Sequence, residues 1–160
     1  MNQPITDTRE PRRQRADFTA LHGVTTRWSD NDIYGHVNNV VYYSYFDTAV
    51  NSWLIEAGLL LLSSEPDTDT QPIGLVVETQ CRYFAPLAFP DTVTVGLRVA
   101  RIGASSVRYE LAIFRNEEDN ACAQGHFVHV YVDRVTRRPA SLPAAWRQRL
   151  ETLQVTPPAS

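Results

Sequence analysis

RWSDNDIYGHVNN, residues 27–39, is the stretch from which the fold can be predicted. It places two carboxylates, an imidazole, three amides and a glycine between a strand-like segment and the long helix that the sequence predicts. Loops held between two rigid elements commonly carry binding and catalytic residues. We therefore expect the rest of the chain to be a scaffold for this loop and for its ligand.

A long helix is predicted directly after the loop, from Val40 to Ala57. Its apolar residues recur at steps of three and four, the period of one helical face. They are Tyr43, Phe46, Val50, Trp53, Leu54 and Ala57. Asn38 or Asn39 can cap the first turn, because a short side-chain acceptor satisfies free backbone N–H groups there. Gly58 is suited to end the helix.

Four strands are predicted after the helix, because apolar and polar residues alternate with a period of two. They cover residues 74–84, 92–102, 105–115 and 121–132. A less regular strand is predicted at 17–28 and a short helix at 144–153. Short connections between neighbouring strands favour an antiparallel sheet. The predicted fold class is α+β, with one antiparallel β-sheet wrapped around one long α-helix.

The composition is that of one globular domain, with 160 residues, 43% of them hydrophobic, and a net charge of −3. That charge gives no general attraction to nucleic acid or to an anionic membrane, so neither partner is expected. Without an apparent signal peptide or membrane span, we expect a cytoplasmic protein. We expect a disordered arm at 1–16, a single domain at 17–153 and a flexible tail at 154–160.

A metal site is not predicted. Asp30 and Asp32 lie near His36 in the sequence. A metal site needs three or more convergent ligands with supporting contacts. His126 and His129, the other candidate ligands, lie in a distant predicted strand.

The loop and the helix start resemble the hotdog-fold acyl-CoA thioesterases, and most closely their 4-hydroxybenzoyl-CoA thioesterase branch. The resemblance lies in the run from Trp28 to Asn39, which contains GHVNN, and in the residues that follow it. Those residues are Tyr42, Tyr43, Tyr45, Phe46 and Asp47. The strand sequence GHFVHV at 125–130 and the segment from Val132 to Pro143 also agree, so the resemblance covers residues 18–150.

The resemblance implies a hotdog fold in which subunits pair through their sheets, as a homodimer or a homotetramer. It implies hydrolysis of an acyl-CoA thioester to a free acid and CoA, at a site between subunits. No metal or organic cofactor is implied, since CoA is part of the substrate.

The family's catalytic aspartate matches Asp32. The resemblance implies that Asp32 attacks the thioester carbonyl or activates water, and an aspartate is normally ionised at neutral pH for either role. Alternatively, Asp32 only caps the loop. A backbone N–H seven positions further on, that of Asn39, would stabilise the developing oxyanion at the helix start. His36 would position water or a carboxylate, or only hydrogen-bond within the loop, and Asp30 would hold the loop.

Coenzyme A would bind partly along the turn between the predicted strands 92–102 and 105–115. There the resemblance implies that Arg101 and Arg108 meet phosphate and that Ser105 and Ser106 meet the pantetheine arm. The alternative is a surface hairpin turn with solvated arginines.

The acyl group would lie beside the long helix. The expected pocket residues are Gly35, Val40 and Tyr43, with the strand 74–84 as a further wall. Gly35 would allow a tight turn or a close approach of the ligand. Aromatic, short-chain and long-chain acyl groups all fit this sequence.

Two other functions fit parts of the pattern. Enoyl-thioester hydratases of the same fold resemble Gly-Asp-x-Asn-Pro-x-His. Here Asp30 and Asp32 lie six and four residues before His36, and no proline follows Asn31, which argues against hydration. A non-catalytic module that binds acyl thioesters would not need an acid in the loop, so Asp32 favours catalysis.

Overall fold

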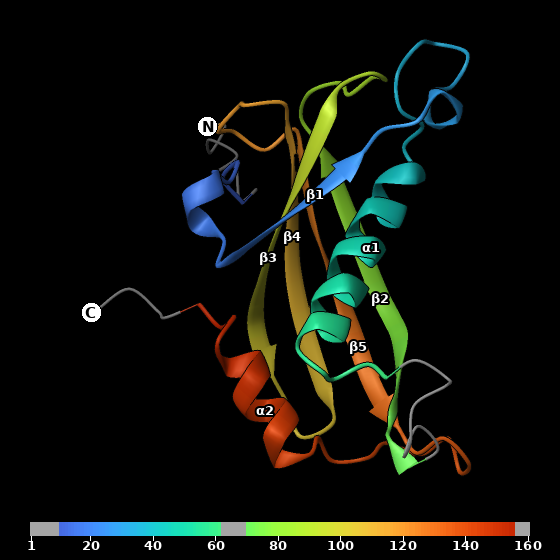
Figure 1. Cartoon of the computed structure of the whole chain (residues 1–160), viewed down its shortest axis with the longest axis vertical. Helices are drawn as coiled ribbons and strands as arrows, with labels where there is room; N and C mark the ends of the chain where they lie inside the picture. The colour runs from blue at the N-terminus through green and yellow to red at the C-terminus, as the bar shows by residue number, and fades with distance from the viewer. Residues whose placement is uncertain (1–9, 62–69, 156–160) are drawn as a thin grey trace, which may run out of the picture.

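The computed structural model describes residues 10–61 and 70–155. Figure 1 shows its helices and strands, which follow one another in this order: a 3-10 helix (Arg15–Asp17), β1 (Ala20–Thr25), a second 3-10 helix (Trp28–Asp30), α1 (Val41–Glu56), β2 (Ile73–Tyr83), β3 (Thr92–Ile102), β4 (Ser106–Arg115), β5 (Ala123–Val132) and α2 (Ala144–Glu151). The two α-helices and the five strands match the predicted ones, with small shifts at their ends, whereas the two 3-10 helices were not predicted.

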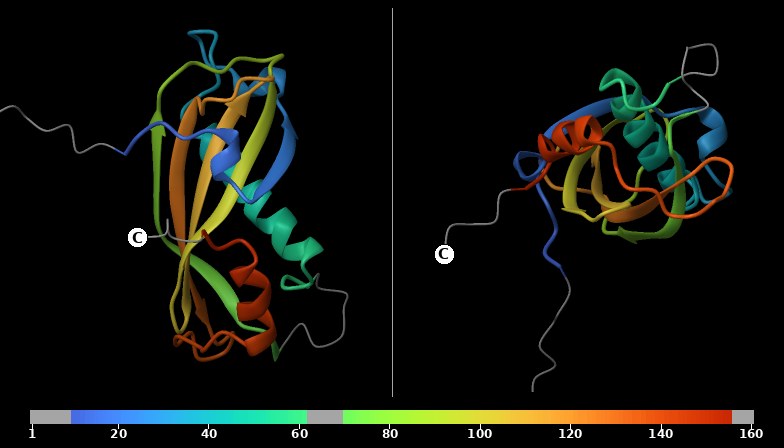
Figure 2. Two further views of the ribbon diagram at one scale, coloured as in Figure 1. Left: turned by 90° about the vertical axis from the view of Figure 1, so that its left-hand side faces the viewer. Right: turned by 90° about the horizontal axis from the view of Figure 1, so that it is seen from below.

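The five strands form one antiparallel sheet in the order β1-β3-β4-β5-β2. The sheet curves around α1, and α2 lies on the same side of the sheet (Figure 2). This arrangement confirms the predicted α+β class and the hotdog fold. The order leaves β2, which follows α1 in the chain, as an edge strand beside β5.

One hydrophobic core fills the space between α1, α2 and the concave face of the sheet. Phe46 and Val50 of α1 are fully buried against it. Trp146 and Leu150 of α2 join the same core, and the Trp146 ring packs edge-on against Tyr131 with centroids 5.4 Å apart. A helix with apolar residues around most of its surface must be covered in this way.

The start of α1 differs from the prediction in one detail. Val40 occupies the N-cap position, and no side chain caps the helix there. The Asn38 side-chain oxygen instead accepts the N–H of Val40 at 3.2 Å, and the Asn38 carbonyl accepts that of Val41 at 2.9 Å. Asn38 therefore bonds to the first turn of α1 from a position before the N-cap. The side chain of Asn39 does not cap the helix. Gly58 follows the helix with φ of +75°, as its predicted role requires.

The expected disordered arm is wrong for residues 10–16, which lie against the sheet. The N–H of Arg13 donates to the Gln124 side-chain oxygen at 2.8 Å, and its guanidinium lies 2.7 Å from the Glu110 carboxylate. At the other end, Gln154 pairs with Val99 of β3, so the expected flexible tail does not include it. The remaining parts of both predicted segments, 1–9 and 156–160, lie outside the described residues.

We expect Gly125→Ala to lower the free energy of unfolding by at least about 1–3 kcal/mol, because overpacking is destabilising. Gly125 of β5 is paired with Cys81 of β2, and a Cβ there would overlap the Gln80 backbone carbonyl. Urea denaturation checks this. The matched control is Gly23→Ala in β1, where a Cβ meets no atom within 4 Å. An equal loss in both variants would contradict the steric explanation.

Candidate active site

The segment from Asp30 to Asn38 folds into a narrow hairpin in front of α1. The N–H of Asp32 donates to the His36 carbonyl at 2.8 Å, and the N–H of Asn38 donates to the Asp30 carbonyl at 2.9 Å. Gly35 has φ of +80° near the tip, a conformation that favours glycine, so the predicted tight turn is confirmed. The backbone bonds place Asp32 and His36 opposite each other.

Asp30 anchors this hairpin to α1. Its side chain is buried, and one carboxylate oxygen accepts the Tyr45 hydroxyl at 2.7 Å and the Arg27 N–H at 2.9 Å. Burial and the neighbouring Asp30 carboxylate raise the pKa of Tyr45, so its hydroxyl stays protonated as the donor. These contacts are those of a residue that holds the loop, as the sequence suggested.

We expect Tyr45→Phe to lower the free energy of unfolding by about 1.5–3 kcal/mol, because it removes a hydrogen bond to a buried charged group. Urea denaturation checks the loss. The control is Tyr34→Phe, because Tyr34 is 83% exposed and its hydroxyl makes no hydrogen bond with a described residue. If Tyr45→Phe lowers the free energy of unfolding no more than Tyr34→Phe does, the bond from Tyr45 to Asp30 does not stabilise the protein, which would contradict this prediction.

Asp32 is held differently, because only one of its carboxylate oxygens is occupied. Oδ1 accepts the N–H of Tyr34 at 2.8 Å. Oδ2 receives no hydrogen bond from any residue that the structure describes. The side chain is half-buried, so its orientation is fixed while one oxygen remains free for a ligand or water.

The start of α1 offers a free backbone donor. Within the described ranges, the N–H of Asn39 donates to no acceptor, while its carbonyl accepts the Tyr83 hydroxyl at 2.7 Å. Asn39 directly precedes the N-cap residue Val40, beside the helix end that carries a partial positive charge. Tyr83 comes from the end of β2, so the sheet helps to fix the orientation of Asn39.

An open hollow of about 300 Å³ lies at this junction. It is lined by His36, Val37, Asn39, Tyr42, Tyr83, Phe84, Ala85 and Pro86. Two residues predicted to be catalytic, His36 and Asn39, therefore line the same hollow. Asp32 is not among its lining residues and is linked to it through the backbone hydrogen bond from Asp32 to His36. Tyr83 and Phe84 also line it and belong to the strand 74–84 that was predicted as a further wall, although neither residue was singled out.

The other predicted site residues are not brought to this hollow. Val40 is exposed beyond it, and Tyr43 is half-buried with its ring packed edge-on against Phe46. The predicted CoA-binding residues Arg101, Ser105, Ser106 and Arg108 lie in and beside the turn between β3 and β4. This turn is at the other end of the sheet, beside α2, whose Arg147 donates to the Gly103 carbonyl (Figure 1).

Arg108 differs from the other predicted CoA-binding residues in having partners on the outer face of the sheet. Its guanidinium lies 4.0 Å from the carboxylates of both Glu78 and Glu110, and 3.2 Å from the His126 ring. One chain alone therefore does not unite the predicted CoA contacts with Asp32.

Two further properties follow from the part of the chain that the structure describes. It contains no group of three or more histidine, cysteine, aspartate or glutamate side chains placed to hold a metal ion. None of its helices has the length and apolar character needed to cross a bilayer.

The model of the thioesterase-like superfamily matches residues 26–150, which include the hairpin, α1, the strands from β2 onward and most of α2. The chain is similar to the PA5185 protein of Pseudomonas aeruginosa strain PAO1, at 52% identity over 90% of this chain and 97% of that one, with a TM-score of 0.83. It is also similar to a thioesterase of Thermus thermophilus solved in complex with coenzyme A and zinc. That similarity is 31% identity over 86% and 95% of the two chains, with a TM-score of 0.69.

Proposed function

This chain belongs to the thioesterase-like superfamily and is a thioester hydrolase, and we propose that it hydrolyses acyl-CoA thioesters to a free acid and CoA. The observation that carries the proposal is the pair of free groups at the hairpin: the Asp32 carboxylate oxygen and the Asn39 N–H. An acid and an oxyanion donor are the two groups that this reaction needs. The similar Thermus thermophilus enzyme, which holds coenzyme A, supports CoA as the carrier.

In the proposed reaction, the thioester carbonyl oxygen accepts the N–H of Asn39. One such donor is worth about 3–4 kcal/mol of transition-state stabilisation. Asp32 either attacks the carbonyl carbon, forming an anhydride that water then hydrolyses, or removes a proton from the attacking water. The C–S bond breaks and CoA leaves as a thiolate that takes up a proton. His36 positions the water, since its exposed ring lines the hollow. The reaction as proposed needs no metal or organic cofactor.

We expect Tyr83→Phe to lower kcat for acyl-CoA hydrolysis by about three- to tenfold, the value of one neutral hydrogen bond. The lost hydroxyl holds the Asn39 carbonyl and thereby the orientation of the oxyanion donor. Steady-state kinetics check the effect, with Tyr34→Phe as the control. A raised KM at unchanged kcat would instead assign Tyr83 to substrate binding alone.

The exposed edge of β2 supports a homodimer. β2 is the last strand of the sheet, and its side chains Leu75, Val76 and Val77 are exposed, Val77 by 59%. An exposed apolar edge strand with unpaired backbone groups is normally covered. In the proposed dimer two copies pair their β2 strands antiparallel about a two-fold axis.

This pairing explains how CoA reaches residues at the far end of the sheet. The β3–β4 turn lies at the Ile73 end of β2, whereas the hairpin lies at its Tyr83 end. An antiparallel pair therefore brings the turn of one copy to the same end as the hairpin of the other. In the dimer, the second copy supplies its Arg101, Ser105 and Ser106 to CoA, while Arg108 stays paired with Glu78 and Glu110.

Thiol release from a panel of acyl-CoA esters tests the proposed function, with chain lengths from acetyl to palmitoyl and an aromatic ester included. We expect hydrolysis of at least one acyl class, with free acid and CoA formed in equal amounts. The matched oxygen esters are the control, and we expect them to react more slowly. Tight binding of every acyl-CoA without hydrolysis would overturn the proposal in favour of a binding module.

A further inference from the structure

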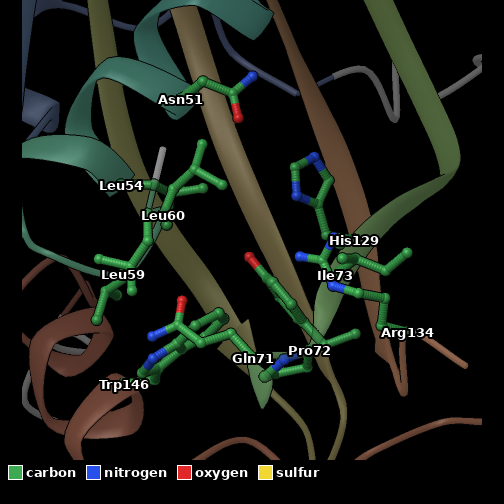
Figure 3. Close-up of a pocket in the computed structure, with 13 residues that line it drawn as sticks. Asn51, Leu54, Leu59, Leu60, Gln71, Pro72, Ile73, His129, Arg134 and Trp146 are labelled. Atoms are coloured by element: carbon green, nitrogen blue, oxygen red, sulfur yellow. The ribbon is translucent and has the colours of Figure 1, made fainter. Parts of the chain in front are cut away.

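A second, more enclosed cavity of about 170 Å³ lies at the opposite end of α1 from the hairpin. It is bounded by the last turns of α1, the start of β2, β5 and α2 (Figure 3). Leu54, Leu59, Ile73 and Trp146 give it apolar walls, to which Asn51, Gln71 and Arg134 add polar side chains. Apolar cavities of about 150 Å³ accept molecules of the size of benzene, so this space is large enough for a small ligand group.

His129 is the unusual residue in this cavity wall. It is 5% exposed, and its Nε2 is buried without a hydrogen-bond partner among the described residues. Figure 3 shows its ring on the β5 side of the cavity, facing the α1 residues Asn51 and Leu54. Burial lowers the pKa of His129, although the nearby Asp47 acts in the other direction, so the ring is neutral at pH 7.

A neutral imidazole has one N–H donor and one acceptor nitrogen. Leaving such groups buried and unpaired is unfavourable, and native proteins seldom do so without a reason. In His129 the buried nitrogen without a partner is Nε2, and the rings of Tyr109 and Phe127 pack beside the imidazole with centroid distances of 5.1 Å and 6.0 Å. Nε2 is therefore matched to a ligand group that can pair with either tautomer, by donating to it or by accepting from it, as a hydroxyl does.

The cavity lies at the far end of α1 from the hairpin, so an acyl chain that ran along the helix would reach it. The stretch from Val40 to Asn51 rises about 17 Å along α1, which an extended medium to long acyl chain covers. Val76 and Thr79 of β2 are paired with His129 and Phe127, so they face the same side of the sheet as these residues. Both are exposed in the single chain, which leaves the space beside α1 open.

We propose that this cavity receives the far end of the acyl chain and that His129 recognises a hydroxyl group there. The proposal rests on the acyl-CoA thioesterase function and names its substrate class, the acyl chains with a terminal hydroxyl. A methyl end would leave His129 unpaired. A carboxylate end would meet both the positive charge of Arg134, which also lines the cavity, and the negative charge of Asp47 near His129, so these two charges would act on it in opposite directions.

Binding of two free acids, myristic acid and ω-hydroxymyristic acid, tests this proposal by calorimetry. We expect the hydroxy acid to bind about tenfold more tightly, the value of one satisfied hydrogen bond. We expect the preference to disappear in His129→Leu and to persist in the control His22→Leu. Equal affinities, or a preference that survives His129→Leu, would overturn the proposal.

Nuclear magnetic resonance of the wild-type histidine rings makes the test independent of any variant. The chain has four histidines, and the hydroxy acid should shift the His129 ring signals while myristic acid shifts them less. Unchanged His129 signals at saturation would overturn the proposal. Because free acids need no hydrolysis, binding at His129 without any acyl-CoA turnover would reject the proposed function and keep the cavity assignment. Acyl-CoA turnover without a preference for the hydroxy acid would keep the proposed function and reject the cavity assignment.

Discussion

Asp32→Asn should reduce kcat for acyl-CoA hydrolysis by about a thousandfold, within the usual range for loss of an acid–base group. The amide has nearly the same shape as the carboxylate, and its oxygen can still accept the N–H of Tyr34, so the hairpin keeps its conformation. What is lost is the negative charge needed to attack the carbonyl or to take a proton from water. Steady-state kinetics measure kcat, and a thermal denaturation curve measures whether the variant stays folded.

The second acid of the hairpin provides the matched control. Asp30→Asn should chiefly lower stability, because the Asp30 carboxylate is buried and receives the Tyr45 hydroxyl and the Arg27 N–H. Asp32→Asn should leave the thermal midpoint almost unchanged. The assignment fails if Asp32→Asn keeps wild-type kcat, or if it loses activity only because the protein unfolds.

Replacing Leu75 and Val77 together by lysine should separate the proposed dimer into monomers. Both side chains are exposed on the edge strand β2, and the two copies would then place like charges against each other across the two-fold axis. We expect kcat/KM for acyl-CoA to fall by about a hundredfold, as misplacement of binding groups commonly causes. Sedimentation and kinetics on the same samples measure the two effects.

Val135→Lys is the control for this edge variant. Val135 is also an exposed valine, but it lies in the segment after β5 and outside the sheet. The Val135→Lys variant should leave both the dimer and the activity unchanged. Full activity of a monomeric double variant would contradict the proposal that the second copy contributes to CoA binding.

The fold was largely predictable because its elements are encoded locally. Steps of three and four residues indicated α1, and the period of two indicated the strands. The order in which strands pair depends on contacts far apart in the sequence, and periodicity does not report it. For that reason the sequence did not reveal that β2 ends beside the start of α1. The contacts of Arg13 with β4 and β5 are equally distant in the chain, so residues 10–16 were expected to be disordered.

The same distinction applies to the site. The hairpin residues Asp30, Asp32 and His36 are neighbours in the sequence, so their proximity could be predicted. Tyr83 reaches Asn39 from 44 residues away, and no local signal marked it. His129 occupies one position of an alternating strand, where only the structure shows that its ring lacks a partner. The roles of Asp32, His36 and Asn39, and of the predicted CoA contacts, stay predictions.

The most direct test of this account is a crystal structure of Asp32→Asn bound to an acyl-CoA analogue. In this analogue a methylene group replaces the thioester sulfur, so that the thioester becomes a ketone that cannot be hydrolysed. We expect the ketone oxygen to lie about 3 Å from the Asn39 backbone nitrogen, a normal hydrogen-bond distance. We also expect its carbonyl carbon to face residue 32, with CoA against the β3–β4 turn of a second copy. An analogue whose carbonyl lies away from both Asn39 and residue 32 would contradict the account.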